Sequence, residues 1–156
     1  MQTKILDYLP YKSSFRFVDH ILSIDENGVQ GEYTLKPESF FYEDHFPGNP
    51  VTPGVIVTEI MAQIGVVVFG IYLILKVQPE NEINTNEEQI FPLLTSTEVS
   101  FFKMVLPGQK VRVVSKKEYF RFGKLKCYVE MYDEAGELVA CGMFAGIIKN
   151  LNKNLY

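Results

Sequence analysis

A long apolar segment with a single charge is the feature that most constrains how this chain can fold. Between Val51 and Leu75 the only formal charge belongs to Glu59. A helix formed here is apolar nearly all the way round, so it must be buried nearly all the way round. We predict such a helix from Pro53 to about Lys76. Thr52 is its predicted N-cap, and Pro53 fits the first helical position, where the missing N–H costs nothing.

The chain on both sides of this helix has the composition of β-strands. Two strands are predicted before the helix, at 15–24 and 29–36, with a hairpin turn at Asn27-Gly28. A polar surface loop is predicted at 78–89. It is followed by four strands, at 97–105, 111–122, 125–132 and 138–148. One helix with so little polar surface requires a curved antiparallel sheet around it, so we predict an α+β fold.

Length and charge limit the function classes. A chain of this length, 1–156, is expected to form a single domain. The formal net charge of −4 argues against nucleic acid as a main partner, because phosphate binding needs a basic surface.

The uncharged run from Ile64 to Leu75 is shorter than the ~20 residues of a membrane span. The first residues lack the apolar core of a signal peptide, so a cytoplasmic location is expected.

No metal site is expected. The two cysteines, Cys127 and Cys141, and the two histidines, His20 and His45, are scattered along the chain without the spacing of zinc ligands. Both cysteines are interpreted as reduced residues of predicted strands. His20 lies in a predicted strand and is interpreted as structural.

His45 lies in a Pro/Gly-rich turn directly before the predicted helix, and Glu59 lies in the second turn of that helix. Apolar surroundings raise the pKa of a carboxyl. The first N–H groups of a helix lack intrahelical partners, and Gly54 has no side chain to shield its own, so a thioester carbonyl can bind there. His45 could then remove a proton α to the carbonyl, and Glu59 could protonate a leaving hydroxyl. Together they suit elimination of water from a 3-hydroxyacyl thioester, or its reverse.

Each of these residues also has a structural interpretation. A single histidine in a loop is often structural, and a single glutamate on an apolar helix can be held by a hydrogen bond. The combination of His45, the turn, the helix start and Glu59 favours an enzyme. Two alternatives remain open: an acyl thioesterase, and a non-catalytic acyl-binding subunit of the same fold.

At these residues the chain resembles the FabZ-type 3-hydroxyacyl-[acyl-carrier-protein] dehydratases. The central motif of that family is roughly HFPGxPxxPGxxxxExxAQ. Here it runs from His45 through Gly54 and Glu59 to Ala62-Gln63, and every fixed position matches. Weaker resemblance extends over roughly residues 5–148.

The resemblance implies a hot-dog fold, in which a curved antiparallel sheet wraps around one long central helix. It implies elimination of water from (3R)-hydroxyacyl thioesters of acyl carrier protein, giving trans-2-enoyl thioesters in fatty acid or related acyl or polyene biosynthesis, without a cofactor. His45 would be the base and Glu59 the acid. The Gly54 N–H would hold the carbonyl, with Phe46 and Pro53 also binding substrate. In the family the histidine and glutamate meet across a homodimer interface, and some members assemble three dimers.

Overall fold

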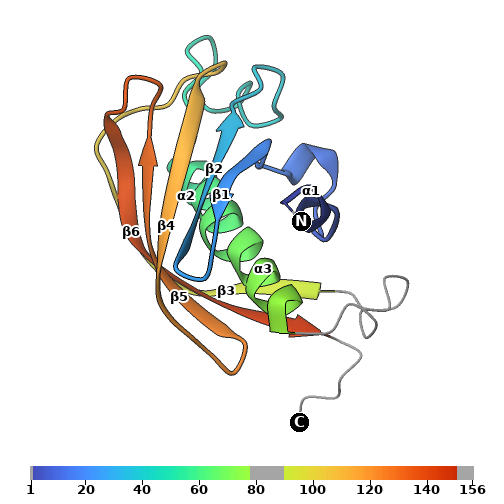
Figure 1. Cartoon of the computed structure of the whole chain (residues 1–156). Helices are drawn as coiled ribbons and strands as arrows, with labels where there is room; N and C mark the ends of the chain where they lie inside the picture. The colour runs from blue at the N-terminus through green and yellow to red at the C-terminus, as the bar shows by residue number, and fades with distance from the viewer. Residues whose placement is uncertain (1, 78–89, 151–156) are drawn as a thin grey trace.

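The computed structural model describes residues 2–77 and 90–150 as a six-stranded antiparallel sheet curved around one helix (Figure 1). The strand order is β1-β2-β4-β5-β6-β3, which makes β1 and β3 the two edges. This confirms the predicted α+β fold, and it is the hot-dog architecture that the family resemblance implies. The elements, in chain order, are α1 (Gln2–Asp7), the 3₁₀ turn η1 (Ser13–Phe15), β1 (His20–Ile24), β2 (Gly28–Thr34), α2 (Gly54–Ala62), η2 (Gln63–Val68), α3 (Phe69–Val77), β3 (Ile90–Phe101), β4 (Lys110–Arg121), β5 (Lys124–Tyr132) and β6 (Leu138–Asn150).

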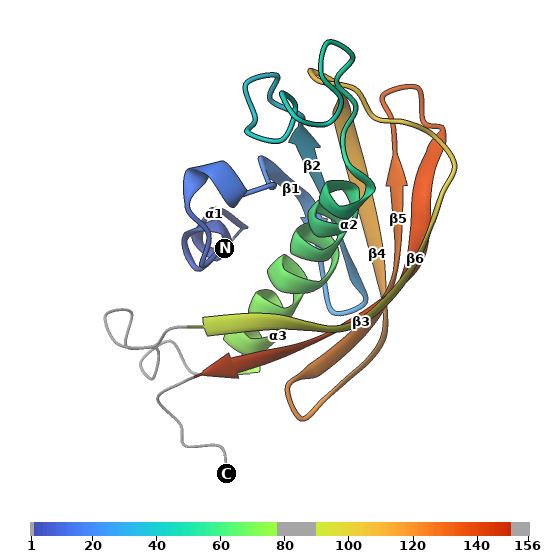
Figure 2. The ribbon, with the colours of Figure 1, turned by 180° about the vertical axis from the view of Figure 1, so that it is seen from behind.

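Segments α2, η2 and α3 form one continuous helix that lies in the concave face of the sheet (Figure 2). Its length and hydropathy would allow a membrane span, but 72% of its most apolar window is buried inside the protein, as in the core helix of a globular domain. The predicted extent of the helix is confirmed. The predicted cap is wrong: Pro53 is the N-cap, and the hydroxyl of Thr52 instead lies 2.7 Å from that of Tyr42.

The middle of this helix, η2, is π-helical, which the apolar pattern does not predict. The carbonyl of Gly65 in η2 accepts a hydrogen bond from the buried Ser115 hydroxyl of β4 at 2.8 Å. A Cβ placed on Gly65 would lie 2.9 Å from the side chain of Val129 on β5. Glycine at this position therefore lets the helix and the sheet approach closely.

The strand predictions are confirmed in number, and two of them are wrong in extent. The predicted strand at 15–24 begins only at His20, because the Phe17 N–H bonds to the side chain of Gln63 at 2.8 Å instead of to a neighbouring strand. Strand β3 begins at Ile90 instead of 97. A hairpin at this place is confirmed: residues 25–27 connect β1 to β2, and Gly28 is already the first residue of β2. The predicted loop at 78–89 lies outside the described residues.

Replacement of Gly65 by alanine should destabilise the protein, although alanine favours helix by about 1 kcal/mol. The added methyl group would push against Val129, and overpacking of this kind costs about 1–3 kcal/mol. Gly54→Ala is the matched control, because its Cβ would sit 3.5 Å from Phe101, an ordinary contact. Urea unfolding should show a lower free energy of unfolding for Gly65→Ala and no decrease for Gly54→Ala. The opposite order would contradict the inference that helix and sheet approach closely at Gly65.

Candidate active site

The loop before the helix holds His45 by its ring and by its backbone. The His45 Nδ1 lies 2.8 Å from the Val51 carbonyl oxygen, and the Val51 N–H donates back to the His45 carbonyl at 3.0 Å. The imidazole stacks on the ring of Phe46, with 4.1 Å between ring centroids, and Phe46 is 56% exposed. Because a carbonyl only accepts, Nδ1 carries the ring proton. The neutral ring therefore keeps the lone pair of Nε2, as a general base requires.

The start of the helix lies three residues beyond this contact. Both the Ile56 and Val57 N–H groups donate to the Pro53 carbonyl, and no side chain caps the helix. The first N–H groups and the positive end of the helix dipole therefore remain available to a substrate oxygen. A Cβ on Gly54 would face the ring of Phe101 at the end of β3, so this end of the helix lies beside that end of the strand.

Glu59 lies one turn further along the helix and is partly buried. Its Oε1 accepts a hydrogen bond from the Gln63 Nε2 at 2.9 Å. Desolvation raises the pKa of Glu59, and the hydrogen bond from Gln63 opposes that rise with a smaller effect. A raised carboxyl pKa favours the protonated form, which can donate a proton.

The amide of Gln63 orients this carboxyl and ties it to the chain before β1. Gln63 is fully buried, its Oε1 accepts the Phe17 N–H at 2.8 Å, and its Nε2 donates to the Phe15 carbonyl at 2.9 Å as well as to Glu59. The motif of the sequence includes Gln63 without indicating a role for it. The structure shows that one side chain holds both η1 and the carboxyl.

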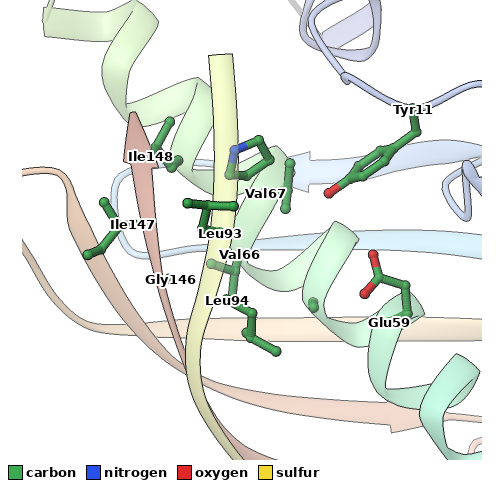
Figure 3. A pocket seen from close by; sticks show the side chains of 11 residues that line it. Tyr11, Glu59, Val66, Val67, Leu93, Leu94, Gly146, Ile147 and Ile148 are labelled. Atoms are coloured by element: carbon green, nitrogen blue, oxygen red, sulfur yellow. The ribbon is translucent and has the colours of Figure 1, made fainter. Parts of the chain in front are cut away.

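Glu59 faces a pocket of about 70 Å³ between the helix and the edge strand β3 (Figure 3). The lining residues are Tyr11, Glu59, Ala62, Val66, Val67, Pro92, Leu93, Leu94, Gly146, Ile147 and Ile148. His45 is not one of them. Five residues of helix turn by about 500°, so Glu59 points about 140° away from Gly54 around the helix axis. Within one chain, the predicted acid therefore faces a different direction from the predicted carbonyl anchor.

Tyr11 is a pocket residue that sequence analysis did not identify. It lies far from Glu59 in the sequence, and no motif links the two. Of the predicted site residues, only Glu59 lines this pocket, and Tyr11 reaches it because the fold brings the segment before β1 close to the helix.

Replacement of Gln63 by leucine should lower the free energy of unfolding by about 2–6 kcal/mol. The change leaves the Phe17 N–H and the Phe15 carbonyl without their partner, and each buried polar group left unpaired costs about 1–3 kcal/mol. Gln109→Leu is the matched control, because Gln109 also accepts a backbone N–H, that of Leu106, at an exposed site. Equal losses for the two variants in urea unfolding would refute a special role for the buried amide.

Comparison with known proteins agrees with this architecture. Residues 9–132 match the FabA-like domain family. The 3-hydroxyacyl-[acyl-carrier-protein] dehydratase FabZ of Caldicellulosiruptor saccharolyticus is 33% identical over 155 residues, covering 94% of this chain and 97% of the relative. The protein of the same name from Xylella fastidiosa strain M12 is 30% identical, covering 92% of this chain and 87% of the relative.

Solved structures show the same fold at lower identity. A chain of the dehydratase heterocomplex ApeI:P of Xenorhabdus doucetiae superposes with a TM-score of 0.75 at 14% identity, covering 95% of this chain and 93% of that one. A hypothetical thioesterase of Streptococcus pneumoniae superposes with a TM-score of 0.61 at 11% identity, covering 95% of this chain and 96% of that one. The structural likeness establishes the hot-dog fold. The sequence likeness establishes the family: the chain belongs to the FabA-like family, among the FabZ-type hot-dog dehydratases.

Proposed function

We propose that this protein eliminates water from 3-hydroxyacyl thioesters of acyl carrier protein, with His45 as base and Glu59 as acid. The observation that carries the proposal is the placement of Glu59: its carboxyl is held by Gln63 at the wall of a largely apolar pocket, where burial raises its pKa. A thioesterase would need a group that activates water. A carboxyl whose pKa is raised by burial keeps its proton to higher pH than an exposed one, which suits it to protonating a leaving hydroxyl.

In the proposed reaction the Nε2 of His45 takes a proton from the α-carbon of the substrate. The thioester oxygen gains negative charge, and the Gly54 N–H at the uncapped helix start stabilises it. The electron pair of the broken C–H bond then forms the double bond between the α- and β-carbons. The C–O bond at the β-carbon breaks as Glu59 gives its proton to the departing hydroxyl, which leaves as water. Transfer of a proton from His45 to Glu59 through solvent restores both groups.

We further propose that each site combines two copies of the chain in a homodimer. The Glu59 pocket borders β3 at Pro92–Leu94, whereas Gly54 faces Phe101 at the other end of that strand. Pro92 and Phe101 are nine residues apart, which is about 30 Å of strand. Antiparallel pairing of two β3 strands would bring the Phe101 end of one copy to the Pro92 end of the other. Gly54 and His45 of one protomer would then meet the partner's Glu59.

Strand β3 is an unpaired, apolar edge of the described sheet, which supports covering by a second copy of the chain. β3 pairs with β6 on one side, and in the described residues no strand pairs with its other side. Long apolar edges of this kind are normally protected, because they pair with other chains. The exposed large apolar side chains on β3 and in the segment after it are Phe91, Leu93, Leu94, Phe101, Phe102, Met104 and Leu106. We propose the dimer as the basic unit, and three dimers would assemble through other surfaces.

Incubation with a 3-hydroxyacyl carrier protein should give a product lighter by one water in intact-mass spectrometry. His45→Ala and Glu59→Gln should each lower kcat by about 10²–10⁴-fold, the usual effect of losing a general base or acid. The wild-type rate should fall as pH rises through the raised pKa of Glu59, because the carboxylate has no proton to donate. His20→Ala is the matched control, since His20 is exposed on β1 beside Glu32. Release of free acid would instead identify a thioesterase.

A complementation experiment tests the shared site. A dimer of one His45→Ala chain and one Glu59→Gln chain should contain one intact site, made by His45 of the second chain and Glu59 of the first, and show about half of the wild-type activity. Tandem purification on two different tags isolates this mixed dimer.

The control is a mixed dimer in which both substitutions lie on the same chain, and for this dimer a shared site predicts no activity. A wild-type chain paired with a chain carrying both substitutions should be inactive if the site is shared. It should be half active if each chain builds its own site, and that result would refute the two-chain arrangement. The mass of the complex in solution distinguishes two chains from six.

A further inference from the structure

The pocket that holds Glu59 contains a second polar group. Of its eleven lining residues, only Glu59 and Tyr11 have polar side chains. Figure 3 shows the Tyr11 hydroxyl pointing into the pocket from one wall, with the Glu59 carboxyl on the adjacent wall. Within residues 2–77 and 90–150, the Tyr11 hydroxyl has no hydrogen-bond partner. A polar substrate group that enters the pocket therefore meets a carboxyl and a phenol.

Tyr11 and Glu59 are both connected to Gln63, Glu59 directly and Tyr11 through Phe15. The ring of Tyr11 packs against that of Phe15, with 6.1 Å between ring centroids. The Phe15 carbonyl accepts a hydrogen bond from Gln63, which also donates to Glu59. Gln63 thus links the two residues, Glu59 directly and Tyr11 through Phe15, although they lie far apart in the sequence.

The phenol of Tyr11 is suited to donating a hydrogen bond. Burial raises the pKa of the Tyr11 hydroxyl, and a negative charge on Glu59 raises it further, so the hydroxyl keeps its proton at neutral pH. The oxygen of a substrate hydroxyl has two lone pairs. One can take the proton of Glu59, and the other remains for a second donor.

We propose that Tyr11 donates a hydrogen bond to the β-hydroxyl oxygen of the substrate and thereby holds it against Glu59. The inference rests on the proposed dehydratase function. As the C–O bond breaks, the oxygen gains electron density, so the bond from Tyr11 strengthens on the way to the transition state. An interaction that strengthens in this way raises kcat more than it lowers KM. No proton leaves Tyr11, and the departing water takes its second proton from Glu59.

Tyr11→Phe tests the proposal, because it keeps the ring and its packing on Phe15 and removes only the hydroxyl. Loss of one hydrogen bond to a group that develops charge should lower kcat for dehydration by about 10–100-fold. KM should stay within about threefold of wild type, because binding of the ground state changes little. Tyr8→Phe is the matched control, since Tyr8 is partly buried on the core and does not line the pocket. Urea unfolding should be the same for both variants and wild type.

A substrate with a different leaving group distinguishes a hydrogen bond from Tyr11 to the leaving hydroxyl from a purely structural role of Tyr11. A 3-chloroacyl carrier protein can lose its α-proton to His45 while chloride leaves with the electron pair of the C–Cl bond, so no acid is needed at the β-position. Tyr11→Phe should release chloride at the wild-type rate while its dehydration is impaired. Equal loss of both reactions would mean that Tyr11 only maintains the fold, and an unchanged kcat for dehydration would also refute the proposal. Failure of wild type to dehydrate would refute the proposed function itself.

Discussion

The buried amide of Gln63 connects the two parts of the chain on which the site depends. Its oxygen and nitrogen bind the backbone on both sides of Arg16, and the nitrogen also binds the Glu59 carboxyl. The segment before β1 is therefore fastened to the helix instead of to the sheet. This one side chain orients Glu59, moderates the rise of its pKa, and anchors Phe15, on whose ring Tyr11 packs at the pocket. A buried polar group with all its partners satisfied stabilises and orders its surroundings, while one with a missing partner is costly.

The fold and the site also depend on close contact between the central helix and the sheet. Gly65 and Gly70 stand where a larger residue would strike Val129 and Ile148 respectively. The π-helical segment η2 contains the first of these glycines and begins at Gln63. π-Helical turns within α-helices are rare and are frequent at functional sites. Here the segment begins at the residue that orients the carboxyl, so packing of the core and geometry of the site share one stretch of helix.

Features set by local chemistry could be predicted from the sequence, and features set by distant partners could not. The apolar run predicts the helix, Asn27-Gly28 predicts the hairpin, and alternation predicts the later strands. The first half of the predicted strand at 15–24 is not a strand, because its backbone bonds to Gln63, a partner that only the fold brings near. The first half of β3 was missed because it contains Pro92 and lies at an exposed edge, where the usual alternation is weak. No sequence pattern marks Tyr11 as a pocket residue, because only the fold brings it close to Glu59.

Strand β3 has a consequence for how such enzymes can evolve. In the proposed dimer it spaces the two halves of each site, although none of its side chains reacts. Insertion of a single residue would displace one half by about 3.3 Å and turn the following side chains to the opposite face. By symmetry, both sites would be damaged at once. The length of this strand should therefore be under the same selection as the reacting residues, and changes in it would be tolerated only when they preserve register.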